Sequence, residues 1–226
     1  MVLCSGVPSQ FALTYLIALA GFGPVNGGHV SFGYVTTLLL LDATLMIAMI
    51  FWFLRRHGDR PHEVFLGGRP IGHEASVGLP MTVMVFLLAR IVLSTTQRIL
   101  PWLHNVPENP LEQFIATRSQ AIVFGIVATI AGGLREEIQR AFIIHQFDRY
   151  LGGARLGLIL YSVMFGLGHS LQGWDAVVAT SILGLFWGYV YMTRRSIVAP
   201  VVSHSGFNAA EILQYVIATA TGRPAL

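Results

Sequence analysis

The sequence predicts an all-α fold: a polytopic transmembrane helix bundle with about six to eight membrane helices, forming one membrane domain over residues 1–226. Hydrophobic residues make up 54% of the chain and charged residues only 11%, whereas soluble domains carry about 25% charged residues. Several apolar runs are also long enough to cross a hydrocarbon core of about 30 Å. Neither an internal repeat nor a long linker divides the sequence, so we expect a single domain.

Hydropathy places the elements of the first half of the chain. Residues 30–54 form a clear span and residues 77–100 form the next, while residues 11–23 are apolar but short for a full crossing. The segment 55–76 contains four arginines, which places it in the cytoplasm by the positive-inside rule. The segment 101–118 has three prolines and few arginines, so we expect it on the outer side.

The second half of the chain predicts four more helices, at residues 119–147, 156–170, 174–192 and 197–220. Arginines cluster at two of the intervening turns, which places those turns on the cytoplasmic side. Gly184 and Gly188 have the GxxxG spacing that lets two membrane helices approach closely.

Composition excludes several chemistries. All 14 basic residues are arginine, so a Schiff-base lysine and a P-loop are both absent. Cys4 is the single cysteine, which excludes an intrachain disulfide and a cysteine-based zinc site. The formal net charge of +3 reflects arginines at helix ends, and we expect no nucleic-acid partner.

Two charged residues lie inside predicted spans, Asp42 and Arg90. Charged side chains inside a membrane are costly and are usually paired or buried in protein. We therefore interpret Asp42 as a buried carboxylate bonded to a neighbouring helix, and Arg90 as paired with an acid or reaching the interface.

The central helix carries a dense charged cluster, with Arg135, Glu136, Glu137 and Arg140 within six residues. One charge at the centre of a bilayer costs roughly 2.5–3.5 kcal/mol on insertion scales. Glu136 and Glu137 precede Arg140 by four and three residues, so either carboxylate can meet the guanidinium on a helix. Pairing explains how the charges are tolerated, and an intramembrane ionisable cluster is a functional-site hypothesis by default.

Two further polar motifs follow on later helices. Phe165 and His169 are four residues apart in FGLGHS, and His204 and Asn208 are four apart in HSGFN. Taken alone, each residue has an ordinary interpretation, because histidines cap helix ends, asparagines bond neighbouring helices and phenylalanines pack. Together with the acid pair, they fit the way helix bundles assemble catalytic sites from facing helices.

The positive-inside rule places His204 near the inner end of the last helix and His169 near the outer end of a short one. The two side chains would then be too far apart to share a site. We therefore expect the turn at 171–175 to lie inside the protein, since irregular backbone is tolerated at membrane depth where it lines a cavity.

The order of these motifs resembles that of the CPBP intramembrane proteases, which include the CAAX prenyl endopeptidases of the Rce1 type. The resemblance covers about residues 119–215, taken as the catalytic core. It implies an Rce1-like bundle and an intramembrane endopeptidase, a hydrolase. The motif residues carry the expected site: Glu136, Glu137, His169, His204 and Asn208 as catalytic residues, with Arg140 and Phe165 in support.

The acid motif departs from the family's EExxxR, because one residue fewer separates the acid pair from the arginine. If Arg140 is held fixed, Glu136 takes the second acid position and Arg135 the first. If the acid pair is held fixed, Arg140 comes one residue early, about 100° off on a helix. In the family the first glutamate is expected to activate water, so Glu136 and Glu137 both stay candidates for that role.

The resemblance also implies a division of chemistry. A glutamate can act as the general base for water, His169 can hold or polarise that water, and His204 and Asn208 can donate to the oxyanion. Glu136, His169 and His204 also form a plausible zinc set with one position open for water. A divalent metal is therefore a candidate cofactor, as in a metalloprotease.

Two other functions stay open. A catalytically inactive relative would bind a membrane peptide as a scaffold or immunity protein, which the shortened acid motif favours. A transporter or proton relay would use Asp42, Arg90, Glu137 and the histidines, although such proteins show two related halves that are not visible here.

The expected partners are membrane lipids and a peptide or protein substrate, while the oligomeric state stays open. The resemblance implies a prenylated CAAX tail as the substrate of a eukaryotic or archaeal-type enzyme. In a bacterial host we expect a pheromone, bacteriocin or sorting-tag peptide instead. We expect a multi-pass protein of a prokaryotic cell membrane.

Overall fold

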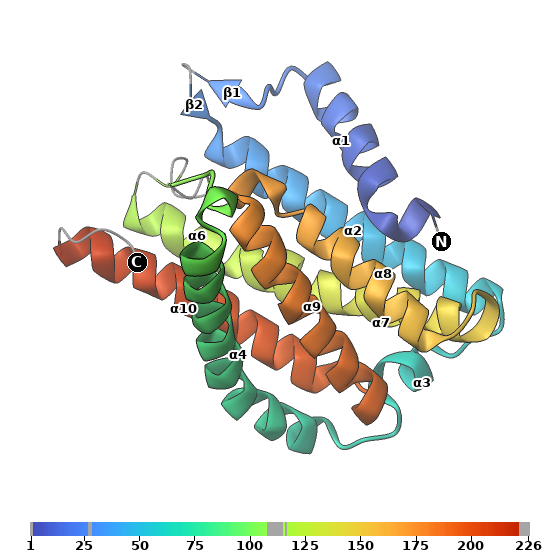
Figure 1. Cartoon of the computed structure of the whole chain (residues 1–226). Coiled ribbons are helices and arrows are strands. Elements are labelled where there is room, and N and C mark those ends of the chain that lie inside the picture. Colours follow the sequence, from blue (N-terminus) through green and yellow to red (C-terminus); the bar gives the residue numbers. More distant parts are fainter. Residues whose placement is uncertain (1, 27–28, 108–114, 116, 222–226) are drawn as a thin grey trace.

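The computed structural model describes residues 2–26, 29–107, 115 and 117–221, and it confirms the all-α fold class (Figure 1). The long helices are α1 (Val7–Leu19), α2 (Phe32–Arg56), α4 (Ile71–Ile99), α6 (Arg118–Ala128), α7 (Glu136–Tyr150), α8 (Ala154–Leu167), α9 (Trp174–Arg194) and α10 (Val198–Thr221). The short elements are η1 (Val2–Ser5), α3 (Pro61–Leu66), η2 (Pro101–Leu103), η3 (Thr129–Arg135), η4 (Ser170–Gln172) and the paired strands β1 (Val25–Asn26) and β2 (His29–Val30).

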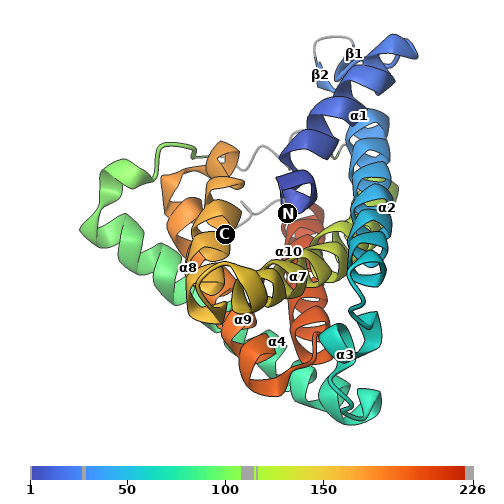
Figure 2. The same ribbon diagram turned by 90° about the vertical axis from the view of Figure 1, so that its right-hand side faces the viewer.

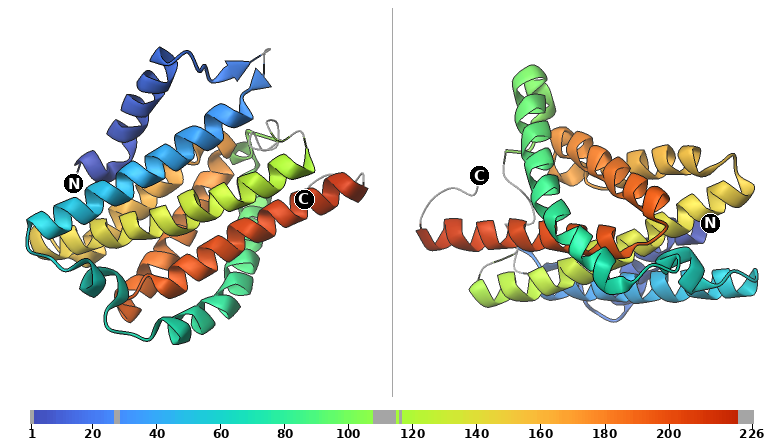
Figure 3. Two further views of the ribbon diagram at one scale, coloured as in Figure 1. Left: turned by 180° about the vertical axis from the view of Figure 1, so that it is seen from behind. Right: turned by 90° about the horizontal axis from the view of Figure 1, so that it is seen from below.

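The helices form one bundle in which α6 and α7 run through the middle. Figure 3 shows α2, the α6–α7 helix and α10 side by side, and these neighbours are in contact. Helices α8 and α9 pack against each other and against α7, and α4 crosses α10 and α9. The C-terminal end of α4 lies at the edge of the bundle opposite α2 (Figure 2).

Among the described residues, three helices are long and apolar enough to cross a membrane: α2, α4 and α9. Helices α1 and α8 are apolar but shorter. The number of membrane passes therefore stays a prediction. Helix α4 begins six residues before the predicted start at 77, because its polar first turn is held by protein contacts: the carboxylate of Glu74 accepts two hydrogen bonds from Arg194, at 2.7 and 2.8 Å.

The predicted helix over 119–147 forms one continuous rod, but η3 within it is a π-helix. Such i→i+5 turns are rare and recur at functional sites. The neighbouring helix α10 lies unusually close here. A Cβ added to Gly133 would lie 2.0 Å from the Ser205 hydroxyl oxygen, and one added to Gly132 would lie 2.5 Å from the Asn208 amide nitrogen. The glycine pair thus sets how closely α10 approaches the central helix.

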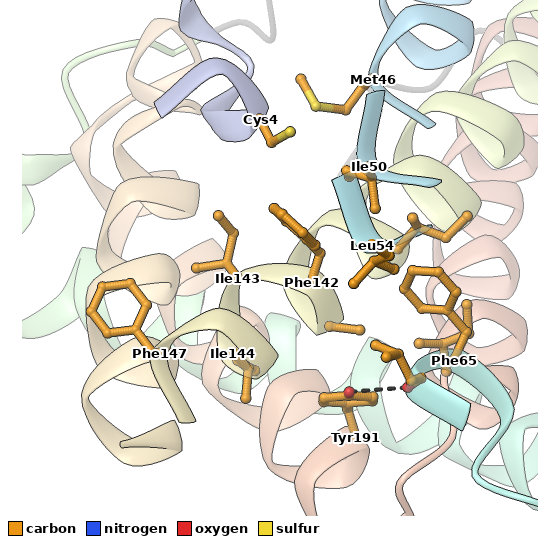
Figure 4. Close-up of a cluster of buried hydrophobic side chains, with 14 residues drawn as sticks. Cys4, Met46, Ile50, Leu54, Phe65, Phe142, Ile143, Ile144, Phe147 and Tyr191 are labelled. Carbon is orange, nitrogen blue, oxygen red and sulfur yellow. Dashed lines mark hydrogen bonds between the residues drawn. The ribbon is translucent and has the colours of Figure 1, made fainter. Parts of the chain in front are cut away.

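The main apolar core surrounds α7 (Figure 4). Its buried side chains come from η1, α2, α3, α7 and α9, and include Cys4, Met46, Ile50, Leu54, Phe65, Phe142, Ile143, Ile144, Phe147 and Tyr191. The Tyr191 hydroxyl donates to the Val64 carbonyl oxygen at 3.0 Å, so its one polar atom is satisfied inside the core. This core fixes α7, whose first turn carries the acid pair.

Asp42 is buried and bonded to neighbouring helices, as interpreted from the sequence. Its side chain in α2 is 3% exposed. One carboxylate oxygen accepts from Arg135 Nη2 at 2.7 Å and the other from the Ser9 hydroxyl at 2.6 Å. The pair joins α1 and α2 to the last residue of the π-helix, directly before Glu136.

Replacing Asp42 by Asn leaves the Arg135 guanidinium buried without a charge partner. Removing one member of a buried ion pair costs about 3–5 kcal/mol, so we expect the free energy of unfolding in detergent to fall by that amount. Asp148→Asn is the matched control, because Asp148 faces Arg195 at 3.8 Å in an exposed pair and such pairs contribute little.

The double variant Asp42→Asn with Arg135→Gln removes both charges and is expected to recover part of the lost stability. A loss no larger in Asp42→Asn than in Asp148→Asn would contradict the assignment.

Candidate active site

The site is built around Glu137 in the first turn of α7. Its side chain is 1% exposed, and Arg140, three residues later, is fully buried. Arg140 Nη1 donates to Glu137 Oε1, as the i,i+3 spacing predicts. The same carboxylate oxygen lies 2.8 Å from His204 Nδ1 on α10. Because an ionised carboxylate only accepts hydrogen bonds, His204 Nδ1 carries the proton in this contact.

Glu136 is the more open of the two acids. Its side chain is 20% exposed, and one carboxylate oxygen lies 3.7 Å from His204 Nε2. Its carboxylate makes no hydrogen bond to an arginine within the described part of the chain. The imidazole of His204 therefore lies between two carboxylates: that of Glu137, which is ion-paired with Arg140, and that of Glu136, which is partly exposed.

Arg135 lies outside this constellation, because its guanidinium is bonded to Asp42 on α2. The acid pair thus contacts His204 on α10, whereas Arg135, directly before it in the chain, contacts α2. Of the two alignments of the shortened motif, this geometry matches the one that keeps the acid pair in the site. The early position of Arg140 does not break its ion pair, because i,i+3 side chains still meet on a helix.

Aromatic rings from two other helices enclose the Arg140 guanidinium. Its carbon Cζ lies 4.8 Å from the Phe165 ring centre, 5.3 Å from that of Tyr161 and 5.5 Å from that of Trp187. Cation–π contacts of this kind contribute about 2 kcal/mol or more when desolvated. Within the described residues, Nε and Nη2 of Arg140 have no hydrogen-bond partner, so the rings and Glu137 hold the charge.

Sequence reasoning missed Tyr161 and Trp187 as site residues. The signal for Tyr161 was available, because it precedes Phe165 by four residues and so shares its helix face. Trp187 lies beside Gly188 of the GxxxG pair, and a Cβ on Gly188 would lie 3.3 Å from Arg140 Cδ. The close-packing face of α9 is thus also the face toward the site.

Phe165 brings the two histidines together. Its ring centre lies 4.9 Å from that of His169 and 6.2 Å from that of His204. Trp187 stacks on His204 at 3.8 Å, with an angle of 13° between the rings. His169 Nδ1 lies 2.9 Å from the Phe165 carbonyl oxygen and so donates to it, which leaves the lone pair of Nε2 available in the neutral ring.

The turn at 171–175, expected to lie inside the protein, is exposed at its start and buried at its end: Leu171 is 80% exposed, whereas Asp175 is 3% exposed. Helix α8, which precedes this turn, has only 14 residues and spans about 21 Å, less than a hydrocarbon core of about 30 Å. This length agrees with the expectation that α8 does not cross the membrane fully. The phenyl ring of Phe165 contacts both imidazoles.

Asn208 lies one turn after His204 on α10 but turns toward the central helix. Its amide nitrogen donates to the Ala128 carbonyl oxygen at 3.1 Å, at the start of the π-helix. An asparagine amide has two N–H donors, so one is left for a ligand. The structure thus brings Glu136, Glu137 and His204 into contact, with His169 at the edge and Asn208 against the backbone.

The predicted metal set can be tested against this geometry. In residues 2–26, 29–107, 115 and 117–221, no three His, Cys, Asp or Glu side chains are grouped closely enough to hold a metal ion. The free Nε2 of His169 suits a zinc ligand, but Glu136, His169 and His204 are not gathered as a set. The metal site stays a prediction, and the chemistry below uses the chain's own residues.

The comparison with protein families agrees with the motifs. Residues 118–210 match the family described as Type II CAAX prenyl endopeptidase Rce1-like. Comparisons with curated proteins and with solved structures gave no match. The family and the three apolar helices make the chain a membrane protein. The resemblance inferred from the motifs is therefore confirmed over residues 118–210, which match the Rce1-like family.

Proposed function

We propose that this protein is an intramembrane endopeptidase that hydrolyses a peptide bond near the membrane surface, as a CAAX prenyl endopeptidase does. One observation carries the proposal. The imidazole of His204 lies between a buried carboxylate that is ion-paired with Arg140 and a more open carboxylate that is not. Two acids in such different surroundings are suited to different roles, one structural and one catalytic.

Glu136 is the proposed general base, because its carboxylate is partly exposed and makes no hydrogen bond to an arginine within the described residues. Glu137 is the proposed positioning residue, since Arg140 and His204 both bond to it. Glu136 takes a proton from water while the water oxygen bonds to the scissile carbonyl carbon. The carbon–nitrogen bond then breaks, and Glu136 returns the proton to the leaving amine.

The oxyanion formed in this reaction needs hydrogen-bond donors. His204 supplies one from Nε2 when it is protonated, and the second N–H of Asn208 supplies another. His169 Nε2 accepts from the attacking water and orients it. A zinc ion held by Glu136, His169 and His204 stays an alternative prediction; if bound, it would supply Lewis-acid activation of water in place of these roles of the two imidazoles.

The proposed substrate is a membrane-associated peptide, either a prenylated CAAX tail or, in a prokaryotic cell membrane, an unlipidated peptide such as a pheromone, bacteriocin or sorting tag. The family description supports the first. The polytopic topology, the cell membrane of a prokaryote and the absence of a nucleic-acid partner belong to the same proposal.

A binding protein without catalysis is the second candidate. It is favoured by the shortened acid motif and by the commitment of Glu137 to Arg140. A transporter or proton relay has less support, because Asp42 is bonded to Arg135 and Ser9 on the other side of the central helix from His204.

Glu136→Gln is expected to lower kcat by about 10²–10⁴-fold, the usual contribution of a general base, with little change in thermal stability. Glu137→Gln is expected to lower both activity and stability, since it removes the charge partner of buried Arg140. Cleavage is measured by mass spectrometry on a farnesylated CAAX peptide and on an unlipidated hydrophobic peptide.

Glu63→Gln is the matched control, because Glu63 lies in an exposed pair with Arg60. If Glu136→Gln keeps full activity, the base assignment is wrong. Binding of either peptide by the wild-type protein without any cleavage would favour the second candidate.

Gly133→Ala is expected to separate α10 from the central helix and move His204 away from the acids. A Cβ there would lie 3.1 Å from Ser205 Cα and 2.0 Å from its hydroxyl oxygen, so backbone as well as side chain must shift. Misplacement by about 1 Å can cost about 10²-fold in rate. We expect kcat to fall by that order in the same peptide assay.

Gly125→Ala provides a control on the same rod, since its added Cβ would meet Ile212 of α10 at an ordinary 3.5 Å. Equal activities of the two variants would show that the close contact at Gly133 does not position His204.

A further inference from the structure

The last turns of α2 carry a cavity outside the proposed active site. It is a shallow, open cavity on one face of α2, with a volume of about 560 Å³, and is lined by Ala48, Phe51, Trp52, Arg55 and Arg56. Helix α2 is apolar and long enough to cross a membrane, and it ends at Arg56. The cavity therefore lies where an apolar span meets the side predicted to face the cytoplasm.

The arginines of this cavity differ from most others at the same end of the bundle, although Arg155 is also without an ion pair within the described residues. Five neighbouring arginines form ion pairs with carboxylates: Arg60, Arg69, Arg149, Arg194 and Arg195. Arg55 and Arg56 form none within the described residues; Arg55 lies over the Phe51 ring, 5.9 Å from its centre. The cavity thus carries two positive charges that the protein does not neutralise.

The helix dipole does not cancel this charge. The C-terminus of a helix carries about half a negative charge, while the two guanidinium groups carry two positive charges. Both side chains are exposed at the end of α2, so an anion can reach them. Guanidinium groups bind phosphate oxygens through paired N–H donors.

The remaining lining of the cavity is apolar. Trp52 is 59% exposed, and tryptophan concentrates at the level of lipid headgroups, where its ring contacts both apolar and polar groups. Phe51 is half-buried and packs on Phe65 of α3 at 5.4 Å between ring centres, which supports one wall. A phosphate beside the arginines and an acyl chain along Trp52 would match the two halves of this surface.

We propose that this cavity binds the headgroup of an anionic phospholipid, with Arg55 and Arg56 on the phosphate and Trp52 against the acyl chain. Each arginine near a membrane surface contributes about a factor of five in affinity for anionic lipid, so the pair contributes about thirty-fold. The site is separate from the acid pair and does not depend on the proposed peptidase activity.

The test measures lipid retention by native mass spectrometry of the full chain, after equilibration in micelles with either phosphatidylglycerol or phosphatidylcholine. The wild-type protein is expected to retain phosphatidylglycerol preferentially. Arg55→Gln with Arg56→Gln is expected to lower that preference about thirty-fold. The double variant Arg55→Lys with Arg56→Lys keeps both positive charges and is expected to keep most of the preference for phosphatidylglycerol.

Arg155→Gln is the matched control, because Arg155 is exposed at the predicted cytoplasmic end, has no ion pair within the described residues and lies outside the cavity. Its preference should equal that of the wild type. Trp52→Leu leaves both charges in place and should shorten retention of either lipid, so the proposal remains testable if the double glutamine variant folds poorly.

Several results would overturn the proposal: no preference for phosphatidylglycerol in the wild type, an unchanged preference in the double glutamine variant, or an equal loss in Arg155→Gln. A change of oligomeric state in the double variant with lipid retention unaltered would also overturn it, and would assign the surface to contact between copies of the chain.

Discussion

The arrangement of the bundle depends on how the charge of Arg140 is compensated. A buried guanidinium is too costly to leave unpaired, and Arg140 is fully buried. Its compensation comes from four helices: Glu137 on α7, Tyr161 and Phe165 on α8, Trp187 on α9, and His204 on α10, which bonds to the same carboxylate. These contacts form together only when the four helices are aligned in one way. The same alignment places His204 beside the acid pair.

A second buried ion pair fixes the opposite side of the same helix. Arg135 bonds to Asp42 on α2, and Gln139 donates to the Cys4 carbonyl oxygen in η1 at 2.8 Å. The Tyr161 hydroxyl donates to Gln139 in turn, at 3.2 Å. Residues outside the matched segment 118–210 thus hold the start of α7 in place. Glu136 lies between these two sets of contacts and keeps an accessible carboxylate.

Much of the fold could be predicted because its signals are local. Apolar runs predicted most helix ends to within a few residues, although α4 begins six residues early. Motif spacing selected Glu137, Arg140 and His204, which are in contact. Asp42 could be predicted as buried, but its partner Arg135 is 93 residues away and no local pattern names it. The enclosure of Arg140 by Tyr161 and Trp187 was missed for the same reason. The π-helix could not be predicted, because a seven-residue segment is too short to show an i→i+5 periodicity in its sequence. The Gly132–Gly133 pair was its only visible sign in the sequence.

The shortened acid motif keeps the same division between the two acids as the longer one. In EExxxR the second glutamate precedes the arginine by four residues and can meet it on a helix, while the first precedes it by five and cannot. In this chain Glu137 precedes Arg140 by three residues and bonds to it. Glu136 precedes Arg140 by four, yet its carboxylate is directed to His204. The aromatic rings of α8 and α9 hold the Arg140 guanidinium in place, and of the two acids only Glu137 bonds to it. In this chain Glu137 neutralises Arg140 and Glu136 keeps a partly exposed carboxylate, so the loss of one residue does not by itself remove the proposed base.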